Sequence, residues 1–87
     1  MPNLEDELTA KGYSLHTWSN GPHFEYPVHD HPYQKILVVL KGSITFSLPH
    51  EERDVVMKAG DRLELRPRTA HAAAVGPDGV TCLEGQR

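Results

Sequence analysis

The chain has few of the features that stabilise or localise a protein by covalent or membrane contacts. Cys82 is the single cysteine among 87 residues, so neither an intrachain disulfide nor a zinc site built on several cysteines can form. Cys82 lies in the apolar segment 80–83, where we expect a buried structural thiol. There is no long apolar run, and no basic segment followed by a hydrophobic one near the N-terminus. The sequence therefore predicts no membrane span, no secretory signal and a reducing, cytoplasmic setting.

The chain also has no large excess of positive or negative charge. The formal net charge is −3 at pH 7, and 24% of the residues are charged. The arginines form no basic run and no RNA-reading aromatic motif accompanies them, so we expect no nucleic-acid or membrane partner. A chain of this length makes one small domain, near the lower limit of what a single hydrophobic core stabilises.

One helix is predicted, at the N-terminus. Asn3 is a suitable N-cap, acidic residues occupy positions 5–7 in the first turn, and Gly12 can end the helix. We assign residues 1–12 to an N-terminal helical segment and residues 13–87 to a β domain.

The rest of the sequence is typical of short strands separated by Gly and Pro. The strands are predicted at 14–19, 24–29, 34–40, 43–48, 55–58, 62–66, 70–75 and 80–84. Lys41-Gly42 is interpreted as a tight hairpin turn, Gly60-Asp61 as a second turn and 76–79 as another hairpin. Many short antiparallel strands indicate an all-β barrel or two-sheet sandwich.

Apolar and polar residues alternate most clearly in two strands. Leu63 and Leu65 are predicted to face inward, as are the apolar residues at 44, 46 and 48. Segment 36–40 is apolar on both faces, so something must cover its outer face. The N-terminal helix and a second copy of the protein are the two candidates.

Three histidines carry the main functional signal. His29 and His31 are two residues apart, so on an extended backbone they point to the same face. His71 shares its parity with Leu63 and Leu65, and if that phase persists it also points inward. Three imidazoles would form a site with open coordination positions. Such a site suits zinc, iron, nickel or copper better than calcium or magnesium.

The spacing around the first two histidines resembles a known motif. His29-x-His31 is followed after three residues by Lys35 and after six more by Gly42. This resembles the first motif of the cupin superfamily, which has a glutamate where this chain has Lys35.

The second cupin motif is similar to the segment from Gly60 through Pro67 to His71. The two motifs together span residues 29–75. The resemblance implies a single-domain jelly-roll cupin β-barrel that is often a homodimer, with a divalent transition metal held inside by the three histidines. Thr69 stands near a usual glycine and Val75 replaces the motif's asparagine.

Lys35 is the departure with the largest chemical consequence. If charged, it would repel a divalent cation, unless burial leaves it uncharged or its stem carries the amine to the barrel rim. Without a carboxylate ligand, we expect lower metal affinity. The alternatives are a metal-free pocket, in which the histidines bind each other or a ligand, and unrelated surface histidines.

The remaining candidate pocket residues are chosen by position and chemistry. We expect Lys35, Tyr33, Phe46 and Gln34 at the pocket, although the parity of Gln34 should turn it outward, and we expect Trp18, Tyr26 and Met57 near it. Three functions stay open: a metal-dependent enzyme with dioxygenase- or isomerase-like chemistry on a small organic molecule, a non-catalytic module for a small molecule or metal, and a dimerisation scaffold. The sequence names no substrate.

Overall fold

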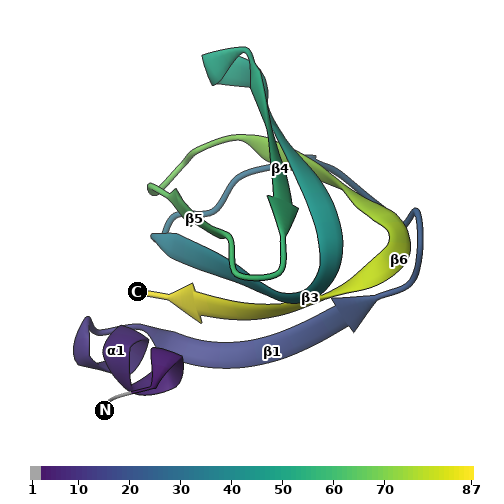
Figure 1. Cartoon of the computed structure of the whole chain (residues 1–87). Coiled ribbons are helices and arrows are strands. Elements are labelled where there is room, and N and C mark those ends of the chain that lie inside the picture. The colour runs from purple at the N-terminus through teal and green to yellow at the C-terminus, as the bar shows by residue number, and fades with distance from the viewer. Residues whose placement is uncertain (1–2) are drawn as a thin grey trace.

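Two long strands form the centre of the fold in the computed structural model, which describes residues 3–87. β3 (Lys35–Leu48) and β6 (His71–Gln86) pair antiparallel, from Lys35 opposite Gln86 to Ser47 opposite Ala72. The sheet order is β1-β6-β3-β4, with β2 paired to β6 and β5 paired to β3. The shorter strands are β1 (Ser14–Asn20), β2 (Glu25–His29), β4 (Arg53–Lys58) and β5 (Arg62–Leu65). The sheet curls round on itself (Figure 1), which confirms the predicted all-β barrel class.

Both predicted hairpins in the central strands are wrong. β3 runs without a break through Lys41-Gly42, and β6 runs through 76–79. Register shifts between Val39 and Ile44 bend the paired strands instead. Gly42 and Gly79 have φ angles of 79° and 80°. A Cβ on Gly42 would overlap the carbonyl oxygen of Gly79. The two glycines therefore allow a shared bend in paired strands, and do not reverse the chain.

The inner face of the bent sheet carries most of the core. Leu63 and Leu65 are buried as predicted, and the buried residues of this cluster also include Leu37, Val39, Ile44, Phe46, Leu48, Met57, Val75, Val80 and Cys82. Cys82 is fully buried, and burial raises the pKa of its thiol to about 11. This burial confirms the prediction of a buried thiol.

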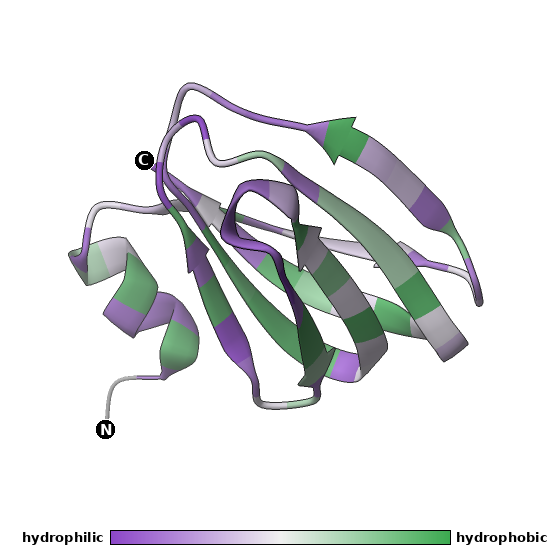
Figure 2. Ribbon diagram, turned by 90° about the horizontal axis from the view of Figure 1, so that it is seen from above, coloured by the Kyte–Doolittle hydropathy of each residue, from purple (hydrophilic) through white to green (hydrophobic). Residues whose placement is uncertain are grey.

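The outer face of segment 36–40 is covered by the N-terminal helix. Ile36 and Val38 form a second buried cluster with Leu8, Tyr13 and Leu83. Leu8 is the buried residue of α1 (Leu4–Ala10). In Figure 2 the central strands carry long hydrophobic stretches, and the helix beside them alternates hydrophobic and hydrophilic bands. The helix therefore covers Ile36 and Val38, whereas Leu40 on the same face is 46% exposed, and cover by a second copy stays a prediction.

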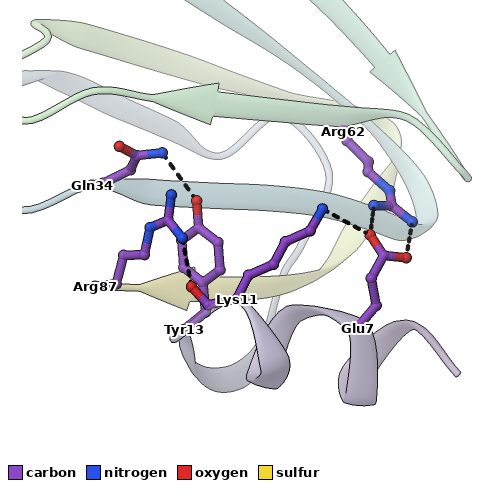
Figure 3. Close-up of polar contacts among 6 residues, drawn as sticks. All are labelled: Glu7, Lys11, Tyr13, Gln34, Arg62 and Arg87. Carbon is purple, nitrogen blue, oxygen red and sulfur yellow. Dashed lines mark hydrogen bonds and ion pairs between the residues drawn. The ribbon is translucent and has the colours of Figure 1, made fainter. Parts of the chain in front are cut away.

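Polar contacts hold α1 against the strands. Asn3 Oδ1 accepts a hydrogen bond from Asp6 N at 2.8 Å, which confirms the predicted N-cap. Arg62, at the start of β5, donates to Glu7 at 2.7 and 3.3 Å. Arg87 Nη1 donates to the carbonyl of Lys11 at 2.5 Å. Figure 3 shows these contacts between the helix and the strand ends.

The connections between strands are short. The connection after β3 contains a 3-10 turn, η1 (Pro49–Glu51). The predicted turn at Gly60-Asp61 is confirmed by a hydrogen bond from Asp61 N to Lys58 O at 2.9 Å. Across residues 3–87, the helix that is present is too short to span a membrane.

Candidate metal centre

His29 and His71 meet because β2 and β6 place them side by side. They are direct partners in the antiparallel register, so their side chains share a face. Their ring centroids are 4.3 Å apart. His71 is 3% exposed and its ring lies 6.4 Å from that of Phe46. His71 therefore points inward as Leu63 and Leu65 do, although Pro67 and Thr69 lie between them in the chain.

His31 reaches the same place from the loop that follows β2. Arg68 N donates to His31 O at 2.6 Å, which ties this loop to the segment before His71. The His31 ring centroid is 4.8 Å from that of His29 and 5.5 Å from that of His71. One ligand nitrogen from each of the three rings lies within 4.8 Å of the others.

Backbone carbonyls fix which nitrogen of two rings is available. His29 Nδ1 lies 2.7 Å from Pro27 O, and His71 Nδ1 lies 2.9 Å from Thr69 O. A carbonyl oxygen only accepts, so each Nδ1 carries the proton and donates it. The neutral rings then present the Nε2 lone pair, which is the form that binds a metal.

The third ring provides the test of whether the site fits a metal. His31 Nε2 is buried and has no hydrogen-bond partner. An unpartnered buried polar atom costs free energy, and here it lies among two other imidazoles with free lone pairs. A divalent transition metal would satisfy it, and three imidazoles suit zinc, iron, nickel or copper. The three residues therefore fit such an ion.

Burial and nearby charges lower the pKa of two of the rings. Burial lowers the pKa of His31, and the charges of Lys35 and the other two histidines lower it further. Burial also lowers the pKa of His71, partly offset by its hydrogen bond to Thr69. Proton competition for these nitrogens is thus weakened near neutral pH.

These shifts predict how the stability of the metal-free protein depends on pH. A histidine in the unfolded chain has a pKa of about 6.5, so below that pH the unfolded chain binds more protons than the folded one. In the presence of a chelator, we expect the free energy of unfolding to be nearly constant between about pH 7 and 8 and to fall as the pH drops through 6.5. Urea unfolding between pH 5 and 8 measures this. The variant H31Q/H71Q should show a flatter profile, and H50Q, in an exposed turn, the wild-type profile. Identical profiles for H31Q/H71Q and wild type would contradict the prediction.

A cavity of about 220 Å³ adjoins the histidines. Its lining comprises His16, Trp18, Tyr26, His29, Lys35, Leu37, Ile44, Phe46, His71, Ala73 and Glu84. Two of the four predicted pocket residues, Lys35 and Phe46, are in this lining. The Lys35 side chain is 10% exposed and does not extend to the rim.

Glu84 is the residue that sequence reasoning missed. Its Oε1 accepts from Trp18 Nε1 at 3.0 Å and lies 3.5 Å from Lys35 Nζ. Its Oε2 accepts from Gln86 Nε2 at 2.9 Å and lies 3.6 Å from His16 Nε2. Lys35 is thus one half of a buried ion pair. Parity was the available signal, because Glu84 shares the inward phase of Val80 and Cys82.

The other two predicted pocket residues lie outside the cavity lining. Tyr33 stacks on His31 with centroids 4.9 Å apart and an interplanar angle of 17°. Gln34 points to the opposite side, where its amide donates to the Tyr13 hydroxyl at 3.1 Å (Figure 3). Gln34 points away from the cavity because it is next to Lys35, and neighbouring side chains on an extended chain point to opposite faces. Of the residues expected nearby, Trp18 and Tyr26 line the cavity, whereas Met57 is in the core.

A curled antiparallel sheet with inward histidines on neighbouring strands defines the class of this protein. Residues 11–84 match the family described as the cupin domain. The chain belongs to this family, as the resemblance predicted. No curated protein matches the sequence.

Solved structures share the fold at low sequence identity. An RmlC-like cupin from Shewanella frigidimarina has a TM-score of 0.74 and 20% identity, over 85% of this chain and 64% of its own. The polyketide cyclase RemF from Streptomyces resistomycificus has a TM-score of 0.75 and 22% identity, over 85% and 54%. The DMSP lyase DddQ from Ruegeria pomeroyi has a TM-score of 0.79 and 20% identity, over 86% and 38%. This chain therefore spans less than two thirds of each of them, and the likeness shows the fold alone.

Proposed function

We propose that this cupin holds one divalent transition metal at His29, His31 and His71, and binds a small organic molecule in the adjoining cavity. The observation that carries the proposal is the buried, unpartnered Nε2 of His31 beside two rings whose Nδ1 atoms are already engaged. That arrangement places one nitrogen from each of the three rings within 4.8 Å of the others, and the Nδ1 hydrogen bonds of His29 and His71 leave their Nε2 lone pairs free to bind an ion.

The residues divide the work between holding the ion and shaping the cavity. Pro27 O and Thr69 O orient two of the imidazoles, and Tyr33 packs on the third. Phe46 and Ile44 supply apolar walls of the cavity. The chemistry that the ion supplies when bound is Lewis-acid polarisation of a substrate oxygen, or oxygen chemistry in the case of iron. This corresponds to the isomerase- and dioxygenase-like reactions named as expectations above.

The metal content of the purified protein tests the proposal. We expect elemental analysis to find about one transition-metal ion per chain, in keeping with one three-histidine site. H71Q removes one ligand at similar size and should weaken zinc binding by more than the roughly 10–100-fold that losing a supporting hydrogen bond costs. H50Q, in the exposed turn after β3, is the matched control. Circular dichroism and thermal unfolding establish that both variants fold.

Two results would overturn the proposal. Metal content unchanged in H71Q would show that the ligand set is wrong. Wild-type protein that takes up no zinc, iron, nickel or copper would leave the metal-free pocket as the function, since the cavity and its Lys35–Glu84 pair remain. The homodimer and the cytoplasmic location stay predictions. Sedimentation and cell fractionation measure them.

A further inference from the structure

Lys35 has hydrogen-bonding capacity that the fold does not use. An ammonium group has three N–H donors. Among residues 3–87 its ion-pair partner is Glu84, at 3.5 Å from Nζ. Glu84, in contrast, is contacted by Trp18 and Gln86 as well. The carboxylate is therefore well satisfied, whereas the ammonium retains donors on the side that lines the cavity.

Both members of the ion pair line the same cavity as His29 and His71. Burial is the main cause that lowers the pKa values of His31 and His71. Of the two charges of the pair, that of Lys35 lowers the pKa of both rings by more than that of Glu84 raises it. The space between Lys35 and the histidines thus has a positive potential even though the pair is neutral as a whole.

Neither the histidines nor Lys35 provides a negative charge for a bound ion. The three ligand groups are imidazoles, which carry no negative charge, so a divalent ion would keep its full charge close to an ammonium. A small anion placed between the ion and Lys35 would reduce this repulsion and use the free N–H donors.

We propose that Lys35 recognises the carboxylate of a small organic acid, which binds in the cavity between Nζ and the histidine site. The metal side of this inference rests on the proposed function. The remaining walls fit the rest of such a ligand, because Leu37, Ile44 and Phe46 are apolar. A cavity of about 220 Å³ is below the range of drug-sized pockets, which favours a compact acid.

Zinc titrations with and without acetate test this assignment. Trp18 is the single tryptophan, and it lines the cavity, so its fluorescence reports binding at the site. For wild type we expect saturating acetate to tighten zinc binding by about tenfold, within the usual range of coupling between two ligands. Acetamide, which has the same shape and no charge, should have no effect.

Variants at two lysines of β3 separate charge from structure. K35M should lose the acetate effect and bind zinc more tightly than wild type when acetate is absent. K35R should retain the acetate effect, since it keeps the charge. K41M changes an exposed lysine of the same strand and should behave as wild type. Thermal unfolding of each variant shows whether it is folded.

The outcomes distinguish this inference from the proposed function. Zinc binding that acetate leaves unchanged in wild type, or changes equally in K35M, overturns the role of Lys35 and leaves the metal site standing. Acetate binding that requires Lys35 in a protein that takes up no metal supports the carboxylate site and overturns the metal. Absence of both overturns both.

Discussion

The substitution E84Q is expected to destabilise the protein by about 3–5 kcal/mol, the usual cost of removing one partner of a buried ion pair. The two side chains are 10% and 9% exposed, so solvent screens the pair little. Glutamine keeps the size and one carbonyl acceptor for Trp18, but it removes the charge that compensates Lys35. Urea unfolding near pH 7 measures the loss.

The double variant K35M/E84Q provides the decisive comparison. It removes both charges, so most of the lost stability should return. K35M alone should cost less than E84Q, because Glu84 keeps its hydrogen bonds from Trp18 and Gln86. If E84Q and K35M/E84Q were equally unstable, the loss would come from the hydrogen bonds of Glu84 and not from an unpaired ammonium.

The substitution G42A is expected to cost at least about 3 kcal/mol, because two penalties add. A φ angle of 79° strains any residue with a Cβ, by about 1–3 kcal/mol. In addition, the new methyl group would overlap the carbonyl of Gly79 on the paired strand, so β3 and β6 would have to separate at the bend. Thermal or urea unfolding measures the loss.

G60A is the matched control for this prediction. Gly60 has a φ angle of 95°, but a Cβ there meets nothing within 4 Å. G60A should therefore show the backbone strain alone, about 1–3 kcal/mol. Equal losses for G42A and G60A would mean that the close approach of the two strands at Gly42 contributes nothing.

The same glycines show where local sequence reasoning fails. A Gly with a positive φ serves a hairpin and a bulged bend equally well, so Lys41-Gly42 and 76–79 could not be distinguished from turns. What differs is the partner strand. Gly42 lies against Gly79 only because β3 and β6 pair over their whole length, and that pairing joins residues far apart in the chain.

In the candidate site, too, local patterns predicted some residues, whereas the pairing of distant strands decided others. Side-chain parity on an extended chain placed His29 and His31 on one face and Lys35 with them, and the cupin motifs added His71. Parity also turned Gln34 away from the cavity. Parity also turns Glu84 inward, but its pairing with Lys35 depended on the register between β6 and its neighbours β1 and β3, which no local pattern encodes.

By itself the sequence determined the all-β class, the capped N-terminal helix and the inward leucines, because each follows from periodicity or spacing over a few residues. The resemblance to the cupin motifs added His71 to His29 and His31. Only the tertiary structure decided that Glu84 pairs with Lys35, that His16 lines the cavity, and that two glycines bend one pair of strands. The physical reason is that these contacts join strands distant in sequence, whose register is set by the packing of the whole sheet.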